Sequence, residues 1–317
     1  MQNYHRHTSY SNIYIADSAA VNEDYAKRAV ELGHKVICSL EHGWAGYYFE
    51  AYELAKKYDL KFIFGCEAYW VKNRLEKDRT NGHIVLLAKN ENGRRAINRI
   101  MSTANEDGYY FRPRVDLELL LTLPADDVMI TTACIAFWHY DDIEDILVQL
   151  HNHFKKNLFL EIQYHNTEPQ IKLNKRILAL SEKYGIEMIV GMDSHYIYPD
   201  QSKERDYILA AKNVHYDDEE GWFMDYPDDE TTMNRFLKQG VLTKNQIQKA
   251  MDNTDLLLEF EGYDTLPNGE PNRIFSKDIK LPSLYDGQHT IDGVLLPKLD
   301  QEQRNKEYSK LISKLFK

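Results

Sequence analysis

Short apolar runs rich in β-branched and aromatic residues alternate with amphipathic stretches from the start of the chain to about residue 215. The apolar runs have the length of strands, and the stretches between them repeat apolar residues at helical spacing. The runs lie at 36–38, 62–64, 84–87, 128–130, 158–160 and 188–190. The predicted helices cover 22–32, 46–58, 93–105, 142–155 and 170–184. This alternation predicts an α/β fold, with a parallel sheet or barrel and helices outside it.

Acidic, histidine and cysteine residues stand just beyond the ends of these runs. They are Glu41, His42, Glu67, Cys134, Glu161, His165, Asp193 and His195. His83 differs because it precedes its own run. The carboxyl ends of parallel barrel strands share one rim, so residues far apart in sequence are expected to converge there around a site.

The N-terminal segment adds a second type of metal-binding pattern. Residues i and i+2 of an extended strand project from the same face, so His5 and His7 can present both imidazoles to one ion. Asp193 and His195 repeat this spacing. Either pair alone is weak evidence, but together with the strand-end residues they predict a metal site.

Composition and charge limit the domain organisation, the binding partners and the cellular location that we expect. The chain has 317 residues, of which 43% are hydrophobic, and this fits one barrel plus an appendage. Its net charge of −11 argues against broad electrostatic attachment to duplex nucleic acid. The three cysteines form no CxxC pair, and no apolar run approaches the roughly 20 residues that cross a bilayer. We therefore expect a cytoplasmic protein that does not engage membranes.

Ordered segments resemble the motifs of the PHP (polymerase and histidinol phosphatase) superfamily. HRHTSYSN at 5–12 with Asp17 and Ser18 resembles the first motif, and SLEHG at 39–43 resembles the second. Further matches are GCEAY at 65–69, GHIVLLAKN at 82–90, GYYFRPRVD at 108–116, TAC at 132–134 and DSHY at 193–196. The segments at 83–90 and 112–116 are similar in particular to the PHP domain of bacterial DNA polymerase III alpha subunits.

The resemblance implies a distorted (β/α)7 barrel over residues 1–215 and a set of metal ligands around three divalent ions. The nine matching positions are His5, His7, Asp17, His42, Glu67, His83, Cys134, Asp193 and His195. By this resemblance His5, His7 and Asp193 hold the first ion, with Glu67 bridging to the second. His83 and Cys134 complete the second site, and Asp17, His42 and His195 hold the third. The His-rich set favours Zn²⁺, Mn²⁺ or Fe²⁺ over Mg²⁺.

Weaker expectations concern the residues around this set. Glu41, Glu161 and His165 are expected to orient ligands through hydrogen bonds. Arg112 and Arg114 are candidates for binding a substrate phosphate, and Tyr10 for the mouth of the site. An exonuclease would further require a groove leading to the rim. The arginines expected to line it are Arg94, Arg95, Arg99, Arg112 and Arg114.

Residues 216–317 are expected to form a mostly helical extension that resembles the segment between the PHP domain and the polymerase palm. Since no palm carboxylates follow, we do not expect this chain alone to polymerise DNA. Two classes of function remain open. The first is a metal-dependent phosphoesterase, either a 3′-5′ exonuclease on single-stranded DNA ends or a small-molecule phosphatase. The second is the N-terminal piece of a split polymerase, whose main task is to bind a separate polymerase fragment.

Overall fold

The computed structural model describes residues 1–14, 16–214 and 221–263, together with the strands at 290–291 and 294–295. Residues Met1–Leu266 form one compact unit and Pro267–Lys317 form another. The second unit contains an antiparallel pair, β8 (Thr290–Ile291) and β9 (Val294–Leu295). Among the described helices, none combines the length and the apolar character that a membrane span requires.

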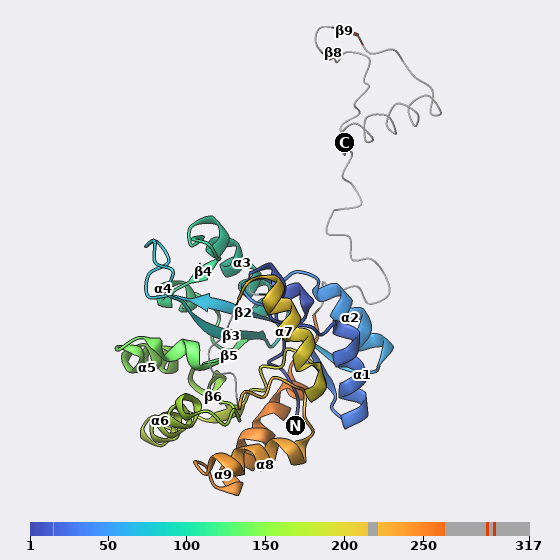
Figure 1. The fold of residues 1–317 in the computed structure, drawn as a ribbon. Coiled ribbons are helices and arrows are strands. Elements are labelled where there is room, and N and C mark those ends of the chain that lie inside the picture. Colours follow the sequence, from blue (N-terminus) through green and yellow to red (C-terminus); the bar gives the residue numbers. More distant parts are fainter. Residues whose placement is uncertain (15, 215–220, 264–289, 292–293, 296–317) are drawn as a thin grey trace. The chain divides into compact units, whose positions relative to one another are not determined.

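The first unit is mixed α/β and is built on one curled, seven-stranded sheet (Figure 1). The strand order is β1-β2-β3-β5-β6-β7, and β4 pairs with β2. The strands are β1 (Val36–Ser39), β2 (Lys61–Trp70), β3 (Gly82–Ala88), β4 (Arg114–Val115), β5 (Val128–Thr131), β6 (Leu158–Ile162) and β7 (Met188–Val190). All six apolar runs of the sequence are therefore strands.

One strand departs from the expected parallel arrangement. β3 runs antiparallel to both of its neighbours, β2 and β5, whereas the other neighbouring pairs are parallel. The amino end of β3 consequently lies at the same rim as the carboxyl ends of the parallel strands. This reversal explains why His83 precedes its apolar run while the other candidate residues follow theirs.

Helices and 3₁₀ turns connect the strands. The helices are α1 (Asn22–Leu32), α2 (Tyr48–Lys57), α3 (Glu91–Glu106), α4 (Leu117–Leu120), α5 (Ile143–Phe154), α6 (Glu168–Tyr184), α7 (Ser202–Ala211), α8 (Asp229–Gln239) and α9 (Lys244–Asp252). The 3₁₀ turns are η1 (Ser9–Ile13), η2 (Ile135–His139), η3 (Lys155–Asn157), η4 (Pro199–Gln201) and η5 (Asn253–Glu259). Each of the five predicted helices has its counterpart, with ends shifted by two residues at most.

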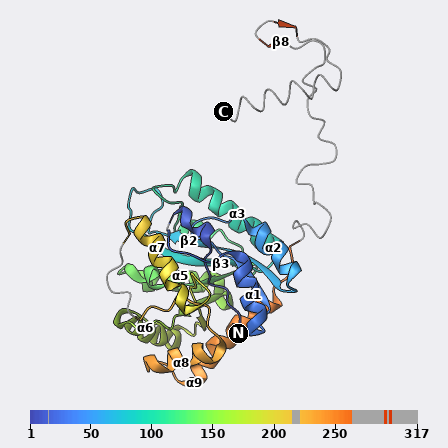
Figure 2. The same ribbon diagram turned by 45° about the vertical axis from the view of Figure 1, so that its right-hand side comes forward.

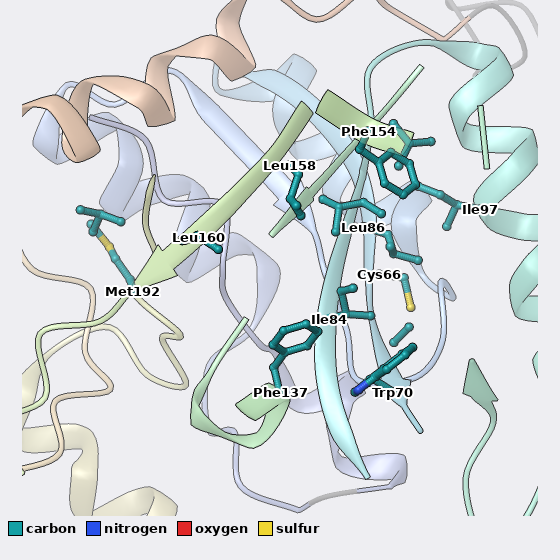
Figure 3. Close-up of a cluster of buried hydrophobic side chains, with 14 of the residues drawn as sticks. Cys66, Trp70, Ile84, Leu86, Ile97, Phe137, Phe154, Leu158, Leu160 and Met192 are labelled. Atoms are coloured by element: carbon teal, nitrogen blue, oxygen red, sulfur yellow. The ribbon is translucent and has the colours of Figure 1, made fainter. Parts of the chain in front are cut away.

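The outer face of the sheet carries most of the apolar packing. Leu86 on β3 and Ile97 on α3 are fully buried in one cluster, together with Trp70 and Phe137 (Figure 3). These side chains come from alternate positions of the strands and from the inward stripe of each helix. The helices therefore cover the convex side and leave the concave side for a second, smaller cluster.

The concave side is filled at one end by apolar side chains. This inner cluster contains Ile63, Val85, Phe159 and Ile189 from the strands, together with Leu257 of η5. The N-terminal segment lies between β7 and β1, since Arg6 bridges to Ser194 and also donates to the carbonyl of Cys38. The N-terminal ammonium group lies 3.1 Å from a carboxylate oxygen of Asp229, the first residue of α8. The N-terminus accordingly lies close to α8 (Figure 1 and Figure 2). Thus α8, α9 and η5 pack within the first compact unit, beyond residue 215.

Candidate metal centre

Period-two alternation turns the two candidate ligands that lie on strands, Glu67 and His83, into the concave side. On β2, Ile63 lies in the inner apolar cluster, and Glu67 follows it by four residues on the same face. On β3, His83 lies two residues before the inner residue Val85. Apolar residues thus fill one end of the half-barrel, and polar residues occupy the other.

The first group of side chains joins the N-terminal segment to the end of β7. Nε2 of His5 lies 3.3 Å from Oε1 of Glu67 and 3.3 Å from Oδ1 of Asp193. Nε2 of His7 lies 3.1 Å from Oε2 of Glu67 and 3.2 Å from the same Asp193 oxygen. His5, His7 and Asp193 offer ligand atoms that all lie within 4.8 Å of one another, which is suitable for a shared ion.

A second group surrounds Glu67. Nδ1 of His42 lies 2.6 Å from Oε2 of Glu67, and Nδ1 of His83 lies 3.1 Å from Oε1. These three residues also have ligand atoms within 4.8 Å of one another. Sγ of Cys134 lies 3.5 Å from Nδ1 of His83 and joins the group at its partly exposed side.

The third group contains His7, His42 and His195, whose ligand nitrogens again fall within 4.8 Å. Nε2 of His195 lies 3.4 Å from Oδ2 of Asp17. The structure therefore brings all nine sequence-predicted positions into one contiguous cluster. Their individual roles as ligands remain a prediction.

Several atoms of this cluster are buried and, within the part of the chain that the structure describes, form no hydrogen bond in spite of the short distances. They are Nε2 of His5 and His7, both ring nitrogens of His42, both carboxylate oxygens of Glu67, Oδ1 of Asp17 and Oδ1 of Asp193. Buried polar atoms in proteins are nearly always paired, so an unpaired group of this size requires an explanation. Divalent cations coordinated by these atoms would satisfy them.

The carboxylates of the cluster are strongly acidic. Burial alone would raise the pKa of Glu67, but the adjacent imidazoles of His83, His42, His5 and His7 hold it well below its usual range. Burial also opposes ionisation of Asp17, yet His195 lowers the pKa of that carboxyl to about 2. Ionised carboxylates enclosed among imidazoles favour cations.

The imidazoles respond to the same charges in different ways. Burial disfavours a proton on His7, but Glu67 and Asp193 raise its pKa to about 9. His42 is buried beside His7, and both effects lower its pKa to about 4, although Glu67 opposes them. Burial of the sulfur, reinforced by Asp193 and Glu67, raises the pKa of the Cys134 thiol, so its thiolate form would require a cation nearby.

Glu161 holds His5 in position. Its Oε1 accepts a hydrogen bond of 2.6 Å from Nδ1 of His5, and its Oε2 accepts bonds of 2.7 Å from the hydroxyls of Tyr4 and Thr131. With Nδ1 engaged in this way, Nε2 of His5 faces the cluster. The orienting role expected of Glu161 agrees with these contacts. Gln163, two residues later on the same face, donates to Oε1 at 2.9 Å, and the period-two spacing could have identified it.

The Glu41 carboxylate accepts hydrogen bonds from two hydroxyl side chains of the first motif. Its oxygens accept hydrogen bonds of 2.7 Å from Oγ1 of Thr8 and 2.6 Å from Oγ of Ser11. Oγ of Ser11 lies 3.2 Å from Nδ1 of His7. Glu41 thus supports His7 indirectly, whereas the sequence reasoning gave Thr8 and Ser11 no role.

His165 is fully buried, and its Nδ1 accepts a hydrogen bond of 3.1 Å from the backbone N–H of Phe223. Its Nε2 has no hydrogen-bond partner among the described residues. Burial lowers the pKa of His165 to about 4, so the ring is neutral. Within the described residues, none of its hydrogen bonds reaches a candidate ligand, and the orienting role expected of it is not evident in these contacts.

The arginines do not line one groove as expected. The Arg114 guanidinium is buried and donates to the carbonyls of Gly108, Asp78 and Arg74, which does not fit phosphate binding. Arg94 and Arg95 pair with Glu91 on the outer helix α3.

Arg112 and Tyr10 lie closer to the centre. The Arg112 guanidinium lies 4.7 Å from the centroid of the Tyr69 ring, and that ring is 5.3 Å from the ring of His83. The backbone N–H of Tyr10 donates to Oγ1 of Thr8 at 3.2 Å. Both residues therefore remain candidates for contact with a substrate.

Comparison with known proteins adds independent information. The PHP domain family matches residues 3–165. The chain is 26% identical to DNA polymerase III subunit alpha of Aquifex aeolicus over 233 residues, and 29% identical to that of Thermus aquaticus over 236 residues. These alignments cover 67% and 69% of this chain but only about a fifth of the length of each relative. A solved amidohydrolase from Chromobacterium violaceum aligns with a TM-score of 0.41 at 14% identity, covering 61% of this chain and 87% of the other. Because the family match spans more than half of the residues, the chain belongs to the PHP domain family.

Proposed function

We propose that this protein is a metal-dependent phosphoesterase that removes nucleotides from the 3′ ends of single-stranded DNA. The observation that carries the proposal is the contiguous cluster of nine potential ligands, several of whose buried atoms have no hydrogen-bond partner among the described residues. Membership of the PHP domain family supports the same chemistry.

The donor set fits transition-metal ions. Five imidazoles, three carboxylates and one thiol suit Zn²⁺, Mn²⁺ or Fe²⁺ better than Mg²⁺, which prefers oxygen ligands. We assign up to three ions to the groups around Asp193, Glu67 and His195. When bound, such ions lower the pKa of water and stabilise negative charge on phosphoryl oxygens.

The surrounding residues would fix the geometry of this centre. Glu161 engages Nδ1 of His5, so that Nε2 is available to an ion. Ser11 donates its proton to Glu41 and can accept one from Nδ1 of His7, which leaves Nε2 of His7 available in the same way. These residues need not contact the substrate to influence its hydrolysis.

The choice of DNA ends rests on the relatives, which are DNA polymerase III alpha subunits. Since the chain spans about a fifth of those proteins, a role in binding a separate polymerase fragment is the second candidate. That role predicts an exposed apolar surface on residues 230–317, most of which lies outside the described residues. In the described part, Leu237 and Leu258 are exposed, at 42% and 40%.

The deciding experiment compares substrates and metals. The purified chain is stripped with a chelator, reloaded with Mn²⁺ or Zn²⁺, and incubated with 3′-labelled single-stranded DNA or with a generic phosphomonoester. We expect metal-dependent release from the DNA, reduced at least about a hundredfold in His5→Ala and Asp193→Ala. Elemental analysis of each protein reports the bound metal independently of activity.

The outcomes separate the candidates. Release from the monoester alone would indicate a small-molecule phosphatase. Equal activity of the wild type and both variants would refute the metal centre. Full metal occupancy without hydrolysis of either substrate would favour the role in binding a polymerase fragment.

A further inference from the structure

Three aromatic side chains, the half-buried Tyr10 and Trp44 and the exposed Tyr47, gather beside the candidate metal centre, on the segments that carry His7 and His42. The rings of Tyr10 and Tyr47 stack with centroids 4.1 Å apart and planes 2° apart. Nε1 of Trp44 donates to the carbonyl of Tyr10 at 3.2 Å, and the Trp44 ring lies 5.5 Å from that of Tyr47. Although two rings contact it, 57% of Tyr47 is exposed.

A second aromatic group lies on the β3 side of the centre. The Tyr69 ring packs against the ring of His83, and the Arg112 guanidinium lies over the face of the Tyr69 ring. Phe111, next to Arg112 in the chain, is 56% exposed, and the guanidinium of Arg79 lies 3.9 Å from its ring centroid. Tyr69 itself is fully buried, so the surface is formed by its neighbours. The Phe111 group, which consists of Phe111, Arg79 and Arg112, therefore combines an exposed aromatic ring with positive charge.

Two of these aromatic residues have an unfavourable backbone conformation. Tyr47 has φ = 56° and Phe111 has φ = 62°, in the left-handed region that bulky residues rarely adopt. Glycine or asparagine would adopt this conformation at a lower free-energy cost. Because the two rings are exposed, burial of their apolar surface offsets little of that cost. Folding alone does not explain an exposed aromatic residue at either position, whereas contact with a ligand does.

The two guanidinium groups favour a ligand that carries negative charge. Neither Arg79 nor Arg112 forms an ion pair with a carboxylate within the described ranges, and Arg112 has only a hydrogen bond of 3.1 Å to Oδ1 of Asn81. Aromatic faces that alternate with unpaired cations match the bases and phosphates of a single strand. A duplex would hide its base faces inside the base stack, so a stacking site selects for a single strand.

We propose that the Tyr10–Tyr47 stack and the Phe111 group are base-stacking subsites that hold single-stranded nucleic acid across the metal centre. This inference rests on the proposed function and specifies its substrate class. The aromatic rings provide affinity without reading sequence, since every base has a stacking face. Arg79 and Arg112 supply the phosphate contacts.

Binding can be measured without catalysis. Fluorescence anisotropy in the presence of a chelator compares a labelled 12-residue oligo(dT) with an abasic strand that has the same number of phosphates. We expect the wild type to bind the abasic strand about tenfold more weakly, and Tyr47→Ala and Phe111→Ala each to weaken binding of oligo(dT) by about tenfold. Tyr47→Phe and Phe111→Tyr should retain affinity, because they keep a ring. Tyr207→Ala, which removes an exposed tyrosine of α7, is the matched control.

The result that overturns the inference is equal affinity of the wild type for both strands, or unchanged binding in both alanine variants. Hydrolysis with Mn²⁺ then separates this failure from failure of the proposed function. If Tyr47→Ala slows cleavage of oligo(dT) and of a small aryl phosphodiester equally, the stacking subsites are refuted while the phosphoesterase stands. If neither substrate is cleaved but ring-dependent binding persists, the proposed function fails and the subsites stand.

Discussion

Charge is unevenly divided between neighbouring histidines of the cluster. The rings of His7 and His42 stack with centroids 3.8 Å apart, a distance at which two positive charges would repel strongly. The pKa of His7 is raised to about 9 by Glu67 and Asp193, which overcome its burial, whereas that of His42 falls to about 4. At neutral pH without metal, the proton therefore resides on His7 and His42 is neutral.

This division predicts proton release when metal binds. His7 must lose its proton to act as a ligand, and since its pKa of about 9 exceeds neutral pH, that proton is present beforehand. Metal affinity should rise as the pH increases from 6 towards 9. Calorimetric titration with Mn²⁺ in two buffers of different ionisation enthalpy should detect the release of at least one proton at pH 7, because the raised pKa values of His7, His5 and the Cys134 thiol keep these ligands protonated beforehand. A binding enthalpy independent of the buffer would contradict this assignment.

Glu161 provides a second prediction at the scale of single residues. The substitution Glu161→Gln keeps the size of the side chain but weakens its hold on Nδ1 of His5, since a neutral amide replaces the ionised acceptor. We expect metal affinity to fall about 10- to 100-fold with little change in folding. Competition with a metal-sensitive dye measures the affinity. Glu204→Gln, at an exposed glutamate of α7, should leave it unchanged, and an equal loss in both variants would refute a specific role for Glu161.

At the scale of elements, the turn after β1 determines where His42 lies. Gly43 has φ = +70°, and a Cβ atom built on it would lie 2.5 Å from Cε2 of Tyr69. Its backbone N–H donates to the carbonyl of Glu67 at 2.7 Å, which ties this turn to β2. Both the backbone conformation and the close approach of Tyr69 therefore require glycine here.

The comparison of Gly43→Ala with Gly33→Ala isolates the contact with Tyr69. Gly33 has nearly the same φ, +72°, but none of the described atoms lies within 4 Å of a Cβ atom built there. We expect Gly33→Ala to lower the free energy of unfolding by about 1 kcal/mol, from the backbone alone. Gly43→Ala should lower it by about 3 kcal/mol, since the clash adds to that cost. Urea unfolding measures both free energies. Equal losses in the two variants would show that the Tyr69 ring moves aside without an energetic cost.

At the scale of the whole molecule, residues beyond 215 contribute to the first compact unit. Leu257 is fully buried in the inner cluster, and Oγ1 of Thr254 accepts a hydrogen bond of 2.7 Å from the backbone of Gln2. The Tyr263 hydroxyl accepts from the N–H of Phe64 at 2.9 Å and donates to the carbonyl of Ala88 at 2.8 Å. These contacts connect the last described helical segment to strands of the sheet.

Truncation tests where the folding unit ends. A chain of residues 1–266 should unfold cooperatively within a few degrees of the full chain, whereas residues 1–214 should lose cooperative unfolding. Removing Leu257 and Phe260 would uncover one end of the inner cluster, at a cost of about 2 kcal/mol for each large apolar side chain. Circular dichroism during heating provides the measurement. If residues 1–214 melted at the temperature of the full chain, the expected boundary at 215 would be supported instead.

The positions of the strands and the residues that form the cluster could be predicted from the sequence, because both depend on local patterns. Alternation along β2 and β3 is a property of adjacent residues, and it turns Glu67 and His83 towards the interior once the neighbouring apolar residues are buried. The pair His5 and His7 is likewise defined by its own spacing. The composition of the candidate site therefore follows from the order of residues along the chain.

Only the tertiary structure determined the direction of each strand and whether an individual arginine is free to bind phosphate. The reversal of β3, which brings His83 to the shared rim, depends on pairing with β2 and β5 rather than on any pattern within 82–88. Arg114 appeared available for phosphate in the sequence, but it donates hydrogen bonds to three carbonyls, and two of them, those of Arg74 and Asp78, come from a distant segment. Local periodicity tells which face a side chain occupies, whereas its neighbours depend on contacts between segments far apart in the chain.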